Sequence, residues 1–295
     1  MTTNQEEIVV NDTHQLADRT VRRIGFGAMQ LPGAGVLGPP KDRHEALAVL
    51  RRTLDLGVNH IDTAQFYGPN VANELIREAL YPYPPDLALV SKVGARRNGA
   101  GAWLPAQAPS DLRADVEENL RSLGVDHLTA VNLRRHEVDD KHDVPLEDQL
   151  AEMAALRDEG KIAGIGLSTV TVEQLDFALS TTAIACVQNA FSLVDQSDTP
   201  VLQRCLAEGI PYVPYFPLGS AFPHMPKVME QAVVKEVASE RAISPAQVGL
   251  AWLLARSANV LLIPGTSSVA HLEENLAVQT IALSPADLSR LNGLS

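Results

Sequence analysis

Three side chains that can hold or move a proton lie near the ends of two apolar runs in this sequence. Asp62 ends the run 58–61, Tyr67 follows five residues later, and Lys92 ends the run 87–91. A buried carboxylate is unfavourable unless a cation pairs with it, and Lys92 can provide that cation. The ammonium would in turn favour the phenolate form of Tyr67 and lower the pKa of that side chain. We therefore expect a proton relay that serves a carbonyl oxygen as it becomes an alkoxide.

Short apolar runs alternate with segments of helical period, and these elements must position the relay. Leu112, Val116 and Leu120 recur on one face of a predicted helix. Thr171 and Ser244, each followed by a Gln three residues later, predict helix starts with a capping box. The runs that predict strands are 24–27, 58–62, 87–92, 128–133, 162–167, 185–188, 210–215 and 260–263.

Eight strands that alternate with helices indicate a parallel sheet covered on both faces. A closed barrel and an open doubly wound sheet both satisfy that pattern. An open dinucleotide-binding sheet would carry G-x-G-x-x-G between its first strand and a helix. Here the first strand continues as "GFGAMQLPGAG" into a loop. We therefore predict an α/β protein with a single (β/α)8 TIM barrel over residues 1–295, with an N-terminal extension or hairpin.

The composition limits the partners that the chain can have. The 295 residues carry a net charge of −12, which argues against a nucleic-acid or anionic-membrane surface. Cys186 and Cys205 are too few for a disulfide framework or a zinc site, so we expect no metal and a buried apolar role for Cys186. The N-terminal segment lacks the apolar core of a signal peptide, and no apolar stretch is long enough to span a membrane. We expect a cytoplasmic protein with a small-molecule partner.

In a barrel of this kind the active site lies at the C-terminal ends of the strands. Each strand-end residue alone has an ordinary alternative, because an Asp can cap a helix and a Tyr can be a packed aromatic side chain. A functional site is favoured by the polar residues that end most of the predicted strands. These are Asp62, Lys92, Arg134, Ser168, Thr169, Gln188, Asn189 and Tyr215.

Six motifs around these positions resemble those of the aldo-keto reductase family. They read "IDTAQFYG", "VSKVG", "GLST", "VQNAF", "YFPLG" and "IPGTSSVAHLEEN", in the order of that family, and the likeness runs from Arg23 to Asn275. The resemblance implies a (β/α)8 barrel that moves hydride between NAD(P)H and a carbonyl group. It thus implies an oxidoreductase that reduces an aldehyde or ketone, with NADPH preferred over NADH.

The resemblance also implies a role for each matching residue. Tyr67 would be the general acid, Lys92 the partner that lowers its pKa, and Asp62 the residue that orients Lys92. Tyr215 would stack on the nicotinamide, whereas its alternative is an aromatic side chain that packs the barrel. His271 stands where many relatives have Arg, which weakens the preference for NADP over NAD. The implied cofactor-binding residues are Gly27, Ala28, Ser168, Thr169, Gln188, Tyr215, Phe216, Pro217, Leu218, Gly219, Ile263, Gly265, Thr266, Ser267, His271, Glu274 and Asn275.

Two positions depart from the family pattern. Thr169 replaces an Asn, which removes an amide from the implied contacts with the cofactor. Arg134, in "VNLR", replaces the His that usually ends the fourth strand. An Arg donates hydrogen bonds but does not release its proton, so it would polarise a carbonyl or bind an anionic or phenolic group while Tyr67 alone carries the proton. His136, two residues further on, is expected on a loop.

The same "VNLR" ending resembles a bacterial branch of the family that includes pyridoxal reductases. It therefore suggests a pyridoxal-type aromatic aldehyde as the substrate. Met29, Phe66 and Trp103 are the candidate substrate-contacting residues. Trp103 belongs to the Gly-rich segment 94–109, which is a candidate lid, although a plain surface loop would have the same composition.

Two rival functions use the same fold. One is an NADPH-binding regulatory module with little or no turnover. The other is a barrel aldolase in which Lys92 forms a Schiff base. The complete set of Asp62, Tyr67 and Lys92 favours the reductase, and the motif "IPGTSSVAHLEEN" would have no purpose in the aldolase.

Overall fold

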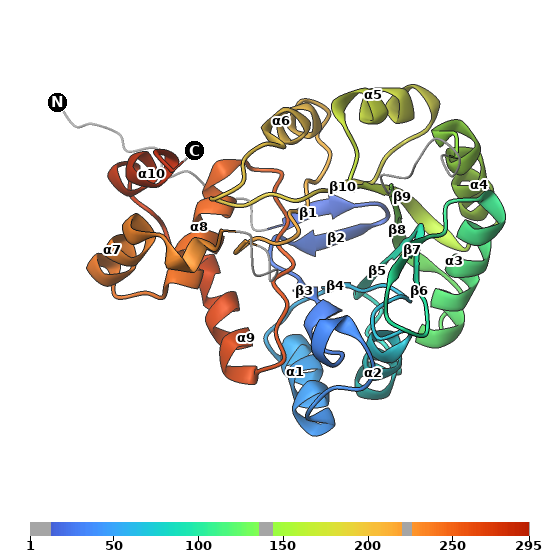
Figure 1. Ribbon diagram of the computed structural model, residues 1–295, viewed down its shortest axis with the longest axis horizontal. Helices are drawn as coiled ribbons and strands as arrows, with labels where there is room; N and C mark the ends of the chain where they lie inside the picture. Colours follow the sequence, from blue (N-terminus) through green and yellow to red (C-terminus); the bar gives the residue numbers. More distant parts are fainter. Residues whose placement is uncertain (1–12, 136–143, 220–225, 295) are drawn as a thin grey trace.

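A ring of parallel strands surrounded by helices forms the body of the protein (Figure 1). The computed structural model describes residues 13–135, 144–219 and 226–294. Six strands pair in the order β10-β9-β8-β5-β4-β3, and every pairing between them is parallel. Their bounds are β3 Phe26–Gly27, β4 His60–Asp62, β5 Ala88–Val93, β8 Leu128–Arg134, β9 Ile162–Ser168 and β10 Cys186–Gln188.

Isolated β-bridges close the ring where the seventh and eighth strands were predicted. Tyr212 bridges to Val187 of β10 on one side and to Val260 on the other, and Leu262 bridges to Ile24 just before β3. The amide of Leu262 donates to the carbonyl of Arg23 at 2.7 Å. The segments 210–215 and 260–263 therefore hold the expected places but pair over fewer residues than expected. With this closure the predicted (β/α)8 barrel is confirmed.

Helices follow the strands in regular alternation, and α7 and α10 lie outside the ring at one side (Figure 1). The capping boxes predicted at Thr171 and Ser244 are both formed, and they begin α5 and α8. None of the helices within the described ranges is both long enough and apolar enough to cross a membrane. The helix bounds are α1 Arg43–Asp55, α2 Val71–Leu80, α3 Pro109–Leu123, α4 Leu146–Asp158, α5 Val172–Thr181, α6 Thr199–Ala207, α7 Ala232–Arg241, α8 Pro245–Arg256, α9 Val269–Leu276 and α10 Pro285–Asn292.

A hairpin of β1 (Thr13–Leu16) and β2 (Arg19–Arg22) closes the N-terminal end of the barrel, as predicted (Figure 1). Asn59, which directly precedes β4, accepts a hydrogen bond from the amide of Arg22 at 2.9 Å and donates one to the carbonyl of Thr20 at 3.0 Å. Leu16 and Val21 of the hairpin are fully buried. They join the apolar cluster of the barrel interior, whose other members are Ala88, Val90, Ala130, Cys186, Val213, Leu261 and Ile263.

The segment 94–109 is not the irregular loop that its composition suggested. It contains an antiparallel hairpin of β6 (Ala95–Arg97) and β7 (Trp103–Pro105). The turn forms because the Asn98 side chain accepts hydrogen bonds from the amides of Ala100 and Ala102, and because Gly101 adopts a positive φ of 80°. The hairpin thus has turn chemistry that the Gly-rich composition concealed.

Replacing Leu16 by Ala should lower the free energy of unfolding by about 3 kcal/mol, because a fully buried Leu leaves a cavity inside the barrel. Urea denaturation of the two proteins measures this difference. Leu206→Ala on α6 is the control, because Leu206 is 49% exposed and its loss should change the stability little. Equal stabilities for Leu16→Ala and Leu206→Ala would show that the hairpin is not part of the cooperative core.

Candidate active site

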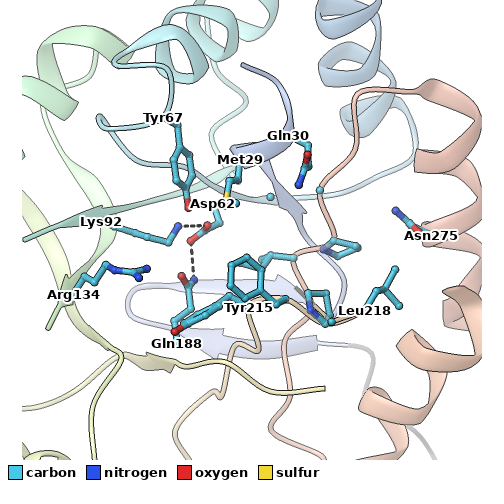
Figure 2. A pocket seen from close by; sticks show the side chains of 17 residues that line it. Met29, Gln30, Asp62, Tyr67, Lys92, Arg134, Gln188, Tyr215, Leu218 and Asn275 are labelled. Carbon is cyan, nitrogen blue, oxygen red and sulfur yellow. Dashed lines mark hydrogen bonds and ion pairs between the residues drawn. The ribbon is translucent and has the colours of Figure 1, made fainter. Parts of the chain in front are cut away.

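One pocket at the C-terminal ends of the strands collects most of the predicted site residues. Figure 2 shows Lys92 and Arg134 at one end of this pocket and Asn275 at the other. The predicted residues that line it are Gly27, Met29, Asp62, Tyr67, Lys92, Arg134, Gln188, Tyr215, Phe216, Pro217, Leu218, Gly219, Ile263, Gly265 and Asn275.

A buried ion pair between Asp62 and Lys92 lies at the base of the pocket (Figure 2). The two side chains are only 2% and 3% exposed. Lys92 Nζ also donates to the Thr63 carbonyl at 3.1 Å, and Gln188 Nε2 donates to Asp62 Oδ2 at 3.0 Å. Burial lowers the pKa of Lys92, but Asp62 and Tyr67 together more than offset this, so the pKa lies above its ordinary value. The lysine therefore remains an ammonium at neutral pH.

Tyr67 is 6% exposed and points its phenolic oxygen toward this ion pair (Figure 2). Lys92 Nζ lies 5.1 Å from the centre of the Tyr67 ring. The prediction that the pKa of Tyr67 is lowered is wrong, although Lys92 does act in that direction. Burial raises this pKa and outweighs the lowering by the charge of Lys92, so the pKa lies above its ordinary value. The phenol therefore stays protonated at neutral pH, which is the form that a proton donor needs.

Arg134 ends β8 and brings a second positive charge into the pocket. Its backbone carbonyl accepts a hydrogen bond from Gln107 Nε2 at 2.8 Å, and its guanidinium carbon lies 5.7 Å from the centre of the Tyr215 ring. Among the residues that the structure describes, the buried Arg134 Nε has no hydrogen-bond partner and the side chain has no carboxylate partner. Arg134 thus has a donor available for a ligand. His136 lies outside the described residues.

The opposite end of the pocket is bounded by segments that approach each other closely. A Cβ on Gly27 would lie 2.4 Å from the Ile263 carbonyl oxygen, and a Cβ on Gly265 would lie 2.6 Å from the Gly27 carbonyl oxygen. Real Cβ atoms do not come so near to other atoms, so glycine is needed at both positions. These two glycines leave backbone at the pocket surface, where a ligand can lie against it.

Several predicted residues lie outside the pocket lining. Ser168 is fully buried, and its hydroxyl lies 3.5 Å from that of Thr169, which in turn lies 3.3 Å from the Tyr215 hydroxyl. Thr266 Oγ1 accepts a hydrogen bond from the Ser268 amide at 3.1 Å, just before α9. The same group of residues outside the lining includes Ala28, Ser267, His271 and Glu274, and their roles stay predictions.

Two of the three candidate substrate residues also lie outside this lining, because they pack on each other. Phe66 is 2% exposed and contacts Tyr67 edge-to-face at 5.3 Å between ring centres. Its other neighbour is Trp103 of the hairpin, at 5.4 Å. Trp103 and Phe66 therefore pack in series against the Tyr67 ring. Of the three candidate substrate residues, only Met29 lines the pocket.

Sequence reasoning missed three residues near the site. Gln30 and Pro264 line the pocket, and both stand beside predicted residues in "GAMQ" and "IPG". His60 lies on the same strand face as Asp62, and burial lowers its pKa to about 4. The imidazole is therefore neutral at physiological pH. The two-residue period of β4 was the signal that would have placed His60 beneath the ion pair.

The residues present fit a nicotinamide nucleotide. Gln188 Oε1 is buried and has no hydrogen-bond partner in the described part of the chain, so it can accept from a ligand amide. Its own amide nitrogen is occupied by Asp62, which fixes the orientation of the side chain. Tyr215 offers an aromatic ring beside Gln188, and Asn275 offers polar atoms at the far end (Figure 2).

Comparisons with known proteins agree with this arrangement. Residues 23–295 match the model of the Aldo/keto reductase family. The chain is 48% identical over 288 residues to a pyridoxine 4-dehydrogenase of Escherichia coli (strain K12), and the match covers 97% of this chain and 99% of that protein. The resemblance inferred from the six motifs is therefore confirmed.

Two solved structures from Klebsiella pneumoniae share the fold. An aldo/keto reductase in complex with NADP and acetate matches with a TM-score of 0.78 and 28% identity, over 96% of this chain and 95% of the other. An aldo-keto reductase in complex with NADPH matches with a TM-score of 0.79 and 28% identity, over 96% of this chain and 94% of the other. Both relatives hold a nicotinamide nucleotide on the same fold.

Thr169 should be a strained position, and Thr169→Asn should raise the free energy of unfolding by about 1 kcal/mol. Thr169 has a φ of 60°, in the left-handed region that a β-branched residue rarely adopts and that Asn tolerates. Thermal or urea denaturation measures the difference. Thr171→Asn is the matched control, because Thr171 has a φ of −85° and carries no such strain. A loss of stability in Thr169→Asn would contradict the argument.

Proposed function

This chain belongs to the aldo/keto reductase family, and on that premise we propose that it reduces a pyridoxal-type aromatic aldehyde to the alcohol with Tyr67 as proton donor. It is an NAD(P)H-dependent oxidoreductase that acts on carbonyl and CH–OH groups, and NADPH is its cofactor. The observation that carries the proposal is the buried Asp62–Lys92 pair beside the protonated Tyr67.

Gln188, Tyr215 and Asn275 are the residues that we propose to hold the cofactor, together with the backbone at Gly27 and Gly265. When bound, NADPH supplies the hydride for the carbonyl carbon. Gln188 Oε1 accepts a hydrogen bond from an amide of the ligand, because its nitrogen already donates to Asp62. Tyr215 gives an aromatic face against which a flat ring packs.

Tyr67 gives its phenolic proton to the carbonyl oxygen as negative charge develops there. Burial keeps the proton on the phenol before the reaction, since it raises the pKa of Tyr67. The positive charge of Lys92 then stabilises the phenolate that remains. Asp62 holds Lys92 charged and in place, because a lone buried ammonium would tend to lose its proton.

Arg134 supports the choice of substrate. Pyridoxal carries an acidic hydroxyl on the ring carbon next to its aldehyde, and the E. coli relative at 48% identity is a pyridoxine 4-dehydrogenase. Within the described residues, Arg134 Nε has no hydrogen-bond partner and no carboxylate pairs with the guanidinium, which suits the binding of an ionised hydroxyl. We propose that Arg134 binds this hydroxyl while Tyr67 meets the carbonyl oxygen. Arg134 remains protonated throughout, so the proton comes from Tyr67.

Tyr67→Phe should lower kcat for pyridoxal reduction by about 100-fold or more, because the proton donor is lost. Loss of NADPH absorbance measures turnover, and NADPH fluorescence measures binding, which should be retained. Tyr212→Phe is the matched control, because Tyr212 is a buried tyrosine outside the pocket that donates to Asp198 at 2.6 Å. Tight NADPH binding by the wild-type protein without oxidation by any aldehyde or ketone would instead favour a regulatory module.

Arg134 should make the enzyme prefer an aldehyde with a neighbouring hydroxyl. The wild-type kcat/KM should be higher for 2-hydroxybenzaldehyde than for 4-hydroxybenzaldehyde, and Arg134→Met should lower this ratio by about 10-fold or more, which corresponds to one charged hydrogen bond. Benzaldehyde, which has no hydroxyl, is the control substrate. An unchanged ratio in Arg134→Met would remove Arg134 from substrate recognition.

A further inference from the structure

A network of buried polar side chains lies on the outer side of β4 and β5, against helices α2 and α3. Its members are Thr63, Gln65, Asn73, Ser91, Asn119 and Ser122, and each is at most 6% exposed. The relay residues Asp62 and Lys92 face the barrel interior, whereas their chain neighbours Thr63 and Ser91 face outward, because side chains alternate along a strand. The network and the relay therefore lie on opposite faces of the same two strands.

Asn119 on α3 is the centre of this network and is fully buried. Its Oδ1 accepts from Asn73 Nδ2 at 3.0 Å and from Ser91 Oγ at 2.6 Å. Its Nδ2 donates to Gln65 Oε1 at 3.0 Å and to the Asp115 carbonyl at 2.8 Å. A carboxamide has two acceptor positions and two donors, so all four are used. An aspartate would bring no donors, and an apolar side chain would leave four buried groups without this partner.

Three of the four bonds from Asn119 lead, directly or through Asn73, to a segment that carries a relay residue, and the fourth stays within α3. Ser91 directly precedes Lys92, and Gln65 lies two residues before Tyr67. Gln65 is held at its other end as well, because its Nε2 donates to the Ala95 carbonyl at 3.3 Å. The loop that carries Tyr67 is thus fixed between α3 and the strand β6.

A third connection passes through Asn73. Thr63 Oγ1 donates to Asn73 Oδ1 at 2.8 Å, and Asn73 Nδ2 donates to Asn119. The carbonyl of the same Thr63 accepts a hydrogen bond from Lys92 Nζ at 3.1 Å. Asn119 therefore holds Thr63, the residue whose carbonyl orients the Lys92 ammonium, through Asn73. It also holds the Tyr67 loop through Gln65.

We propose that Asn119 is a positioning residue of the proton relay, which sets the placement of Tyr67 relative to Lys92 without touching either. The inference rests on the proposed role of Tyr67 as proton donor. Displacements of about 1 Å in a catalytic constellation can cost on the order of 100-fold in rate, so a loosened network lowers turnover even where the relay residues are intact.

The test compares Asn119→Ala with Asn259→Ala in the full-length chain. Asn259 is also a buried amide, which donates to the Ile210 carbonyl at 2.8 Å and accepts from Ser257 Oγ at 2.6 Å, on the far side of the barrel from the pocket. Both variants should lose stability. Asn119→Ala alone should lower kcat for aldehyde reduction by about 10-fold or more, with NADPH affinity retained.

The dependence of kcat on pH is a second measurement, and it should not change if Asn119 only stabilises the fold. The charge of Lys92 lowers the pKa of Tyr67, so a looser approach of the two groups should move the alkaline limb of the Asn119→Ala profile to higher pH. Asn259→Ala should keep the wild-type profile. If Asn119→Ala does not fold, Ser91→Ala decides, because it removes one hydrogen bond to Asn119 and should change kcat in the same direction.

The outcomes separate the two proposals. A wild-type protein without turnover overturns the proposed function itself. A wild-type protein that reduces aldehydes, with Asn119→Ala showing the wild-type kcat or the wild-type pH profile, overturns the positioning role alone. Where Asn119→Ala does not fold, an unchanged kcat in Ser91→Ala overturns it. A lowered kcat in Asn119→Ala with a shifted profile, and neither change in Asn259→Ala, supports it.

Discussion

The pairing of Asp62 with Lys92 inside the barrel is the interaction on which the rest of the site depends. Both side chains are almost fully removed from water, and the desolvation of two charges costs several kcal/mol per ion. The arrangement is tolerable because the remaining polar atoms also have partners, namely Gln188 on the carboxylate and the Thr63 carbonyl on the ammonium. The ends of β4, β5 and β10 must therefore stay at fixed separations, which a closed ring provides.

The ring of strands also separates the residues of the proton relay, which lie inside it, from the residues that hold the strands in place, which lie outside it. The hairpin of β1 and β2 closes the end of the barrel opposite the pocket and excludes water from the interior, where His60 stays neutral beneath the ion pair. Electrostatic interactions are stronger in such a dry interior than in water. Outside the ring, the amides around Asn119 hold the backbone of the same strands. Because side chains alternate along β5, Ser91 points outward to Asn119 while its neighbour Lys92 points inward to Asp62.

Much of the fold and the site could be predicted because both follow local rules. Strand ends of a barrel meet at one rim, so Asp62, Lys92, Arg134 and Gln188 could be grouped from their positions alone. The direction of the Tyr67 pKa could not, because it depends on how fully the phenol is buried. The contact of Trp103 with Phe66 and the bonds of Asn119 depend on how α3 and the hairpin of β6 and β7 pack, which no sequence period encodes.

The uneven pairing around the ring has a consequence for turnover. A ladder of six residue pairs joins β8 to β9. Within the described residues, two main-chain hydrogen bonds join the segment at Tyr212 to the segment at Val260, from the Tyr212 amide to the Asn259 carbonyl and from the Leu261 amide to the Tyr212 carbonyl. Fewer main-chain bonds must therefore break where these two segments part than where β8 parts from β9. The nucleotide that we propose lies along the junction of these two segments has to enter and leave in every cycle, while the relay must stay in register. The relay stands on β4 and β5, away from this junction, so an opening there would leave Asp62, Lys92 and Tyr67 in register.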